Sequence, residues 1–199
     1  MDHDEARTRI LDAAEKLFYD RGIQSVGMDE LRTTAGVSLK RLYQCFPAKH
    51  DLVEAYLRRR DTRWRTALTA YVTERADTPE ARPLAVFDWL HDWFTASDFR
   101  GCAFINSFGE LGATSDGVAR VARDHKRALL SYLTDLARDA QLTEPTATGE
   151  QLALLVDGAI TTAAITGNPS AAQQARTAAE ALLAAARTPT APGGNRRKP

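Results

Sequence analysis

Four cationic side chains gather in a stretch of the chain that contains no acidic residue. Arg32, Lys40, Arg41 and Lys49 lie between positions 31 and 50, where the sequence has neither Asp nor Glu. The whole chain carries 26 Lys and Arg against 26 Asp and Glu, so its formal net charge is zero. A cationic face of this kind suits contacts with phosphate groups. A solvated helical face is the alternative reading of the same four cations.

The local pattern predicts that two short helices carry these cations. A helix over about residues 28–34 is followed by Gly36 in a turn, and Ser38 stands where a side-chain oxygen would accept the first free N–H groups of a third helix. Pro47 ends that third helix. Two short helices joined by a Gly-containing turn make a helix-turn-helix, whose second helix enters the major groove of DNA. Lys49 then begins a long helix, where free N–H groups also favour an anion.

Helical periodicity continues along almost the whole chain. Apolar residues recur at helical spacing over residues 5–22, and a long helix runs from Lys49 to about Ala76. Further helical segments follow, and none of them alternates as a strand would. We therefore predict an all-α fold with about nine helices. It consists of a helix-turn-helix domain over residues 1–48, a helical regulatory and dimerisation domain over 49–188 and a disordered basic tail over 189–199.

Composition places the chain among ordinary globular proteins. Hydrophobic residues make up 44% and charged residues 26% of the sequence. The two cysteines lack CxxC spacing, which indicates neither a disulfide framework nor a zinc finger. No apolar run approaches the roughly 18 residues of a membrane span. We expect a soluble protein of the reducing cytoplasm, with no cofactor, no metal and no membrane partner.

The block AGVSLKRLYQCFPAKHDL, with the helix before it, resembles the DNA-binding domain of the TetR family of transcriptional repressors. In that family A-G-V-S, a Leu-Tyr pair, a Phe and a Lys recur at this spacing. The resemblance is close over about residues 6–55 and extends to the whole length as architecture. It implies a groove-facing start of the recognition helix at Ser38, Leu39, Lys40 and Arg41, a DNA-backbone contact at Tyr43 and a phosphate anchor at Lys49, with Leu42 and Phe46 in the core. The local charge adds Arg32 to this candidate DNA-contacting set.

Two positions depart from the family pattern. Gly27 stands where the family usually has a capping Thr or Ser that also touches phosphate, and Cys45 stands where a His or Tyr is usual. Both are candidate lost contacts. Lys40 and Arg41 could each pair with O6 and N7 of guanine, or could only grip phosphate.

The last two helical segments carry apolar stripes suited to dimerisation. A single helix-turn-helix makes few base contacts, so such proteins dimerise to place two recognition helices about 34–36 Å apart, or a multiple of this distance. Small residues permit close helix approach and resemble the four-helix dimer interface of the family. The predicted homodimer interface consists of Leu152, Leu155, Val156, Ala159, Ile160, Ala163, Ala175, Ala178, Ala179 and Leu182. The core of a monomer is the alternative.

Aromatic residues concentrate in the middle of the chain. With a few polar groups they suit a mostly apolar pocket for a small-molecule effector, although aromatic residues at helical spacing also build plain core. The predicted pocket consists of Trp89, Trp93, Phe94, Phe104, Ile105 and Phe108, with Asn106, Glu110, His125 and Asp157 as polar partners. Asn106 and Glu110 share a helix face, so with His125 they could bind a ligand or a metal, or hydrogen-bond in the core.

These features predict a DNA-binding transcriptional regulator and not an enzyme. The favoured form is a repressor that binds a palindromic operator as a homodimer and is released by a small molecule, with the long helix from Lys49 as the lever. An enzyme would need Cys102, His125 and Asp157 as nucleophile, base and orienter, and their spacing does not support this. Motifs of phosphate loops, zinc proteases and serine hydrolases are absent from the sequence.

A thiol sensor is the remaining alternative. Cys45 lies on the predicted recognition helix near Arg41 and Lys49, whose positive charges would favour a reactive thiolate. A structural cysteine is the other interpretation of the same residue.

Overall fold

The computed structural model describes residues 2–187, so the predicted basic tail lies outside the described residues. Within this range the chain forms nine α-helices and no strand, which confirms the all-α prediction. The helices are α1 (His3–Arg21), α2 (Met28–Ala35), α3 (Leu39–Cys45), α4 (Lys49–Arg75), α5 (Arg82–Phe94), α6 (Ala103–Leu111), α7 (Asp116–Asp139), α8 (Pro145–Thr166) and α9 (Ala171–Ala185).

Local capping explains where the three short helices at the front of the chain begin and end. Gly22 ends α1 with φ +83°, a conformation that L side chains rarely adopt. Gly36 ends α2 in the left-handed region, and its N–H bonds back to the last turn. Ser38 begins α3 because its hydroxyl accepts a hydrogen bond of 3.2 Å from the N–H of Arg41. Gly27 precedes α2 without a side-chain cap, as expected from its departure from the family pattern.

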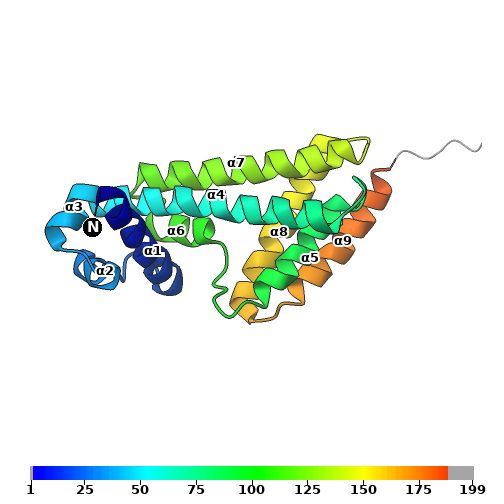
Figure 1. Cartoon of the computed structure of the whole chain (residues 1–199). Coiled ribbons are helices and arrows are strands. Elements are labelled where there is room, and N and C mark those ends of the chain that lie inside the picture. Colours follow the sequence, from blue (N-terminus) through cyan, green and yellow to red (C-terminus); the bar gives the residue numbers. More distant parts are fainter. Residues whose placement is uncertain (1, 188–199) are drawn as a thin grey trace, which may run out of the picture.

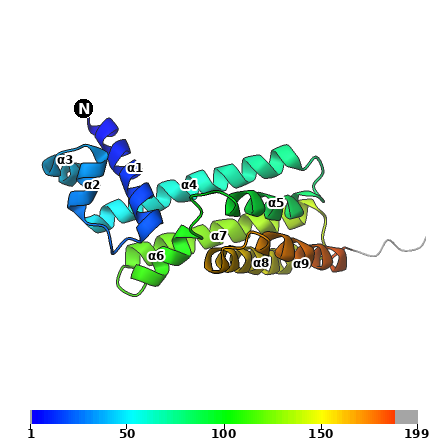
Figure 2. The same cartoon turned by 90° about the horizontal axis from the view of Figure 1, so that it is seen from below.

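The helices divide between two ends of an elongated molecule (Figure 1). Helices α1 to α3 lie at one end, and the long helices α4 and α7 run side by side from there to the other end, where α5, α8 and α9 pack together. In the second view, α8 and α9 form one outer face and α6 lies next to α1 near the junction of the two ends (Figure 2). A movement of α6 would therefore take place next to α1 and the helices that pack with it.

Helices α7 and α8 approach each other closely at one glycine. A Cβ atom on Gly149 of α8 would lie 2.3 Å from Oγ1 and 2.9 Å from both N and Cα of Thr134 on α7. Since real Cβ atoms essentially never make such contacts, glycine at this position permits the α7–α8 packing. In residues 2–187 no helix combines the length and hydropathy that crossing a membrane requires.

Candidate nucleic-acid interface and its links to the regulatory helices

The outer face of α3 carries the residues predicted to contact DNA. Leu39 and Tyr43 lie one helical turn apart and are 43% and 44% exposed, and Lys40 is exposed beside them. The opposite face of α3 is buried, with Leu42 fully inaccessible to solvent and Phe46 only 2% exposed, as predicted for core residues. Helix α3 thus presents polar, cationic and aromatic groups to solvent from a fixed position.

The predicted cations Arg41 and Arg32 differ in their solvent exposure and in their ion pairs. Arg41 is partly exposed on α3. Arg32 on α2 pairs with Asp29 on its own helix, at 2.7 Å from Nε to Oδ1. Because half-exposed pairs of this kind are weak, Arg32 can exchange Asp29 for a phosphate at little cost.

Lys49 does not point freely into solvent. It begins α4 as predicted, but its ammonium group donates hydrogen bonds to the carbonyl oxygens of Ile23 at 2.7 Å and Val26 at 2.6 Å. Burial lowers the pKa of Lys49, and the charge of Glu110 acts in the opposite direction. In this structure Lys49 ties the turn between α1 and α2 to α4, so contact with a phosphate would require these bonds to break.

Cys45 lies on the inner side of α3. Its side chain is buried at 8% exposure, and its sulfur is 4.0 Å from the carbonyl oxygen of His3 on α1. The carbonyl oxygen of Cys45 accepts a hydrogen bond from Arg7 at 3.4 Å. The Lys49 ammonium is bound to the carbonyl oxygens of Ile23 and Val26, and the burial of Cys45 suits a structural cysteine.

Helix α6 grips the turn between α1 and α2 through Glu110. Its carboxylate accepts hydrogen bonds from the backbone N–H groups of Ile23 at 3.1 Å and Gln24 at 2.9 Å, and the Gln24 amide donates to the Glu110 carbonyl at 2.8 Å. Glu110 was predicted to line a pocket, and it lines a cavity of about 340 Å³ next to α1. It also joins α6 to the α1–α2 turn, which sequence reasoning missed.

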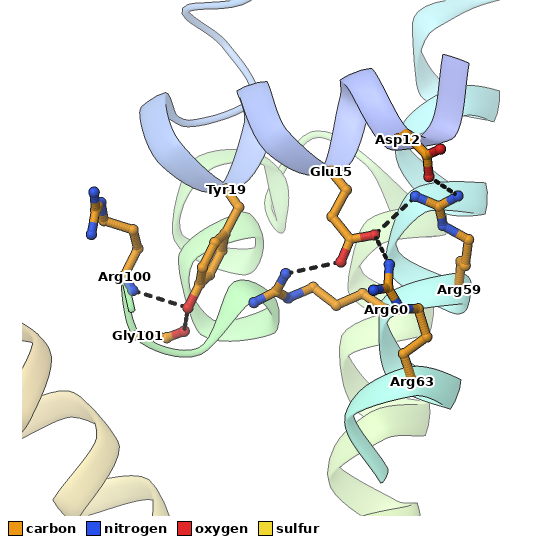
Figure 3. Close-up of polar contacts among 8 residues, drawn as sticks. All are labelled: Asp12, Glu15, Tyr19, Arg59, Arg60, Arg63, Arg100 and Gly101. Carbon is orange, nitrogen blue, oxygen red and sulfur yellow. Dashed lines mark hydrogen bonds and ion pairs between the residues drawn. The ribbon is translucent and has the colours of Figure 1, made fainter. Parts of the chain in front are cut away.

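Tyr19 makes a second link of the same kind (Figure 3). Its hydroxyl donates to the carbonyl oxygen of Gly101 and accepts from the N–H of Arg100, both at 2.9 Å. The Arg60 guanidinium lies 3.6 Å above the Tyr19 ring. Burial raises the pKa of the Tyr19 hydroxyl, which keeps it protonated and able to donate.

Helix α1 is held on α4 by one carboxylate among three arginines (Figure 3). Glu15 contacts Nη2 of Arg59 at 2.9 Å, Nη1 of Arg60 at 3.3 Å and Nη1 of Arg63 at 2.7 Å. Asp12 adds a contact of 2.8 Å to Arg59. The Glu15 side chain is only 19% exposed, so these contacts are partly shielded from water. The three-helix domain is thereby fixed to the long helix that would serve as the lever.

The residues predicted to line one pocket separate into two groups. Trp89 and Trp93 stack at 5.5 Å between ring centroids, and both pack edge-to-face on Trp64 of α4. This packed aromatic cluster, which also contains Phe94 and Phe99, belongs to the core. The second group lines an open groove of about 950 Å³ between α6 and α7, and it consists of Phe104, Ile105 and Phe108.

The predicted polar partners do not all share one site: Asn106 and Glu110 line the cavity next to α1, whereas His125 and Asp157 do not line it. Asn106 donates to the carbonyl oxygen of Arg100 at 3.0 Å, Glu110 binds the α1–α2 turn, and Asp157 pairs with Lys126. The idea that Asn106, Glu110 and His125 bind one metal, or form one hydrogen-bonded triad, is therefore wrong. Throughout residues 2–187, no group of three or more His, Cys, Asp and Glu side chains is arranged to hold a metal ion.

His125 is instead the centre of a buried chain of polar groups. Its Nδ1 lies 2.7 Å from Oδ1 of Asp61 on α4, and Asp61 also contacts Arg65 at 2.8 Å. Burial acts to lower the pKa of His125, but hydrogen bonds to Asp61 and Cys102 outweigh it and raise the pKa. Burial acts to raise the pKa of Asp61, and the bonds from His125 and Arg65 lower it to about 2.

Cys102 and His125 thus come together as one sequence alternative required, but Asp61 takes the place expected for Asp157. Burial acts to raise the pKa of the Cys102 thiol, while the His125 hydrogen bond and the charge of Lys126 lower it below its ordinary value. Cys102 is only 6% exposed and His125 2%. Both side chains are therefore almost inaccessible to solvent in this structure.

The apolar stripe predicted for dimerisation faces mostly inward. Helix α8 packs against α7 and α9, and this contact uses the side of α8 that carries the predicted residues. Six of the ten are buried within the protomer, which makes that part of the prediction wrong: Leu152, Val156, Ala159, Ile160, Ala163 and Ala179. Leu155, Ala175 and Leu182 are partly buried and Ala178 is exposed. The outer side of α8 instead exposes Leu154 at 73% and Ile165 at 79%.

Comparison with known proteins agrees with this architecture. The family model of bacterial regulatory proteins of the tetR family matches residues 10–56. An uncharacterized HTH-type transcriptional regulator of Mycobacterium tuberculosis is 30% identical over 158 residues, which cover 67% of this chain and 77% of the relative. The HTH-type transcriptional activator FasR of Mycolicibacterium smegmatis is 48% identical over 56 residues, which cover 28% of this chain and 26% of that protein.

A solved structure matches over nearly the full length. The crystal structure of a TetR-family transcriptional regulator from Streptomyces coelicolor superposes with a TM-score of 0.82 at 30% identity, over 92% of this chain and 96% of the other. The helix-turn-helix, the long helix α4 and the helical second half therefore occur together in a known kind of regulator. By fold and by sequence, the chain belongs to the TetR family of transcriptional regulators.

Proposed function

We propose that this regulator is a cytoplasmic repressor that binds a palindromic operator as a homodimer and releases it when a small molecule binds. The observation that carries the proposal is the acid-free outer face of α3, where Ser38, Lys40 and Tyr43 are exposed at one end of the molecule. Such a face can approach the negatively charged groove without like-charge repulsion. Arg32, Leu39 and Arg41 extend the proposed contact, and Lys49 is the weakest member because two carbonyl groups occupy its ammonium.

DNA recognition is tested by selecting bound sequences from a pool of random duplexes. A palindrome with half-sites about one helical turn apart, or a multiple of it, is expected. Replacing Arg41 by Ala should relax the preference at one base pair in each half-site, while Arg138→Ala, at the far end of α7, should leave it unchanged. If Arg41→Ala weakens all sequences equally, Arg41 contacts only phosphate. If no duplex binds at low ionic strength, the proposal fails.

For dimerisation we propose the exposed side of α8 and α9. Leu154 and Ile165 are about three helical turns apart on this outer face, and they are 73% and 79% exposed. Large apolar side chains left in water favour contact with a second copy. Leu154→Asp together with Ile165→Asp should yield a monomer in sedimentation experiments and weaken operator binding strongly. A double variant that remains a dimer would contradict this choice of face.

The sign of regulation needs a separate measurement. FasR, which this chain resembles over 56 residues, is an activator, and the relatives matched over more of the chain are named only as regulators, so the proposal of a repressor rests on the resemblance of residues 6–55 to the TetR family of repressors. A reporter placed behind the selected operator should be expressed more strongly when this protein is removed. Lower expression on removal would instead establish activation.

A further inference from the structure

The open groove between α6 and α7 has two chemically different walls. Helix α6 contributes an apolar wall of Phe104, Ile105 and Phe108, and the groove has a volume of about 950 Å³. Phe108 is 51% exposed although the similarly apolar Phe104 beside it is only 3% exposed. A half-exposed Phe at the edge of a groove gives an apolar ligand surface to cover.

Helix α7 contributes a charged wall in which cations outnumber acids. Arg120, Arg123 and Arg127 follow one another at spacings of three and four residues, so they share one face of the helix, and all three are exposed. Asp116, Asp124 and Lys126 also line this wall, and Lys126 is paired with Asp157 of α8. Arg127 is paired with Asp124 on the same helix. The nearest carboxylate to Arg120, that of Glu54, is 3.8 Å away.

Arg123 is the cation best placed to receive an anion. Its Nε donates to the carbonyl oxygen of Ala119 at 3.1 Å, which fixes the side chain along α7. Among residues 2–187, no carboxylate lies within 4.0 Å of its guanidinium nitrogens. The other guanidinium N–H groups therefore have no acidic partner there, and a guanidinium binds carboxylate and sulfonate groups through paired hydrogen bonds.

We propose that this groove binds a small organic anion whose acidic group pairs with Arg123 and Arg120 and whose flat apolar body lies against Phe108 and Phe104. The proposal deepens the proposed ligand response and rests on it. It commits to a small molecule because the two walls match the two parts of an amphiphilic anion. For a second copy of this chain to occupy the groove instead, it would have to place a carboxylate side chain against Arg123 and Arg120.

The floor of the groove is connected to the DNA-binding helices. The Phe104 ring stacks on His125 at 3.7 Å between centroids, with 11° between the planes, and His125 bonds to Asp61 on α4. Helix α6 also carries Glu110, which holds the α1–α2 turn. A ligand that moves Phe104 or shifts α6 therefore acts directly on two links to the front of the molecule.

A matched pair of dyes tests the groove on the full chain. 8-Anilino-1-naphthalenesulfonate is an aromatic anion, and N-phenyl-1-naphthylamine has the same ring system without the sulfonate. In fluorescence titrations, Arg123→Gln should weaken binding of the anionic dye about tenfold and that of the neutral dye less than about twofold. Phe108→Ser should weaken both. Arg138→Gln, on the same helix outside the groove, should change neither.

Equal binding of the anionic dye by the wild type, Arg123→Gln and Arg138→Gln would overturn the proposal. So would a change from dimer to monomer caused by Phe108→Ser, because the groove would then be an interface between copies. These titrations contain no DNA, so they test the groove independently of the proposed function. Operator release is measured separately: dye binding in the groove without release would contradict the ligand response alone, and release that persists in Arg123→Gln would contradict the groove alone.

Discussion

Replacing Glu15 by Gln tests how α1 is held on α4. The change keeps the shape of the side chain but removes the negative charge that contacts Arg59, Arg60 and Arg63 at 2.9, 3.3 and 2.7 Å. Two of these partners are well shielded, since the Arg60 and Arg59 side chains are 13% and 22% exposed, while Arg63 is 64% exposed and contributes little. Three neighbouring cations would then remain without their central anion.

The expected loss follows from the two shielded contacts. A hydrogen bond to a charged group contributes roughly 1.5–3 kcal/mol when buried, and partial exposure together with the retained amide reduces this. We therefore expect Glu15→Gln to lower the free energy of unfolding by about 2–3 kcal/mol, measured by urea denaturation at one fixed protein concentration. For a chain of this size the melting temperature should fall by about 5–10 °C.

Glu5→Gln is the matched control on the same helix. Glu5 is 47% exposed and pairs with Arg9, which is 51% exposed, so its loss should cost no more than about 0.5 kcal/mol. The destabilisation caused by Glu15→Gln should also shrink at high salt, where repulsion among the arginines is screened. Equal stabilities of the two variants would refute the idea that the arginine cluster fixes α1 to α4.

Three further predictions concern single positions. Lys49→Met should lower the free energy of unfolding by about 1–3 kcal/mol because it leaves two carbonyl groups without their donor. If the salt dependence of DNA binding is the same in this variant and in the wild type, Lys49 makes no phosphate contact. Because the pKa of His125 is raised in the folded state, protonation of His125 stabilises the fold fully below the unfolded pKa of about 6.5, and this stabilisation is lost as the pH rises through the folded-state pKa. The melting temperatures of the wild type and His125→Gln should therefore converge with rising pH. Gly149→Ala should destabilise the chain by about 1–3 kcal/mol in urea because its methyl group meets the backbone of Thr134, whereas Gly109→Ala, with nothing within 4 Å, should be neutral or slightly stabilising.

The sequence was sufficient to predict the helices of the DNA-binding end. Gly22, Gly36 and Ser38 stop or start helices through contacts with residues only a few positions away, and such local chemistry can be read from a single chain. The fold class followed for the same reason, since the apolar spacing is helical along the chain. What these caps position, namely the exposed face of α3, was therefore predictable as well.

Contacts between distant segments were not predictable in the same way. The bond from Glu110 to Ile23 joins residues 87 positions apart, and nothing in the spacing of either one indicates the other. Similarly, Asp61 on α4 meets His125, whereas Asp157 on α8 pairs with the neighbouring Lys126. The direction of the Lys49 side chain was missed because both of its acceptors are backbone atoms, which carry no signal of residue type.

The apolar stripe of α8 shows a different limit. Periodicity identifies which residues share a helix face, but it does not reveal whether that face meets the same chain or another copy. Leu152 and Val156 are buried in the core of one protomer, while Leu154 and Ile165, which do not belong to the predicted stripe, are exposed. The aromatic residues divided between core and groove for the same reason.

The double grip on the α1–α2 turn has a consequence for anyone who builds hybrid regulators. The carbonyl groups of this turn accept hydrogen bonds from Lys49, at the start of α4. The N–H groups of the turn donate to Glu110, which lies far along the chain from a fusion point placed after α3. A fusion joined at the boundary of the two halves would thus transfer helices α1 to α3 without the Glu110 carboxylate that holds their turn. Under the effector response proposed above, chimeras with a carboxylate at the position equivalent to 110 should still release DNA when the ligand binds, and chimeras without it should bind DNA equally well with and without the ligand.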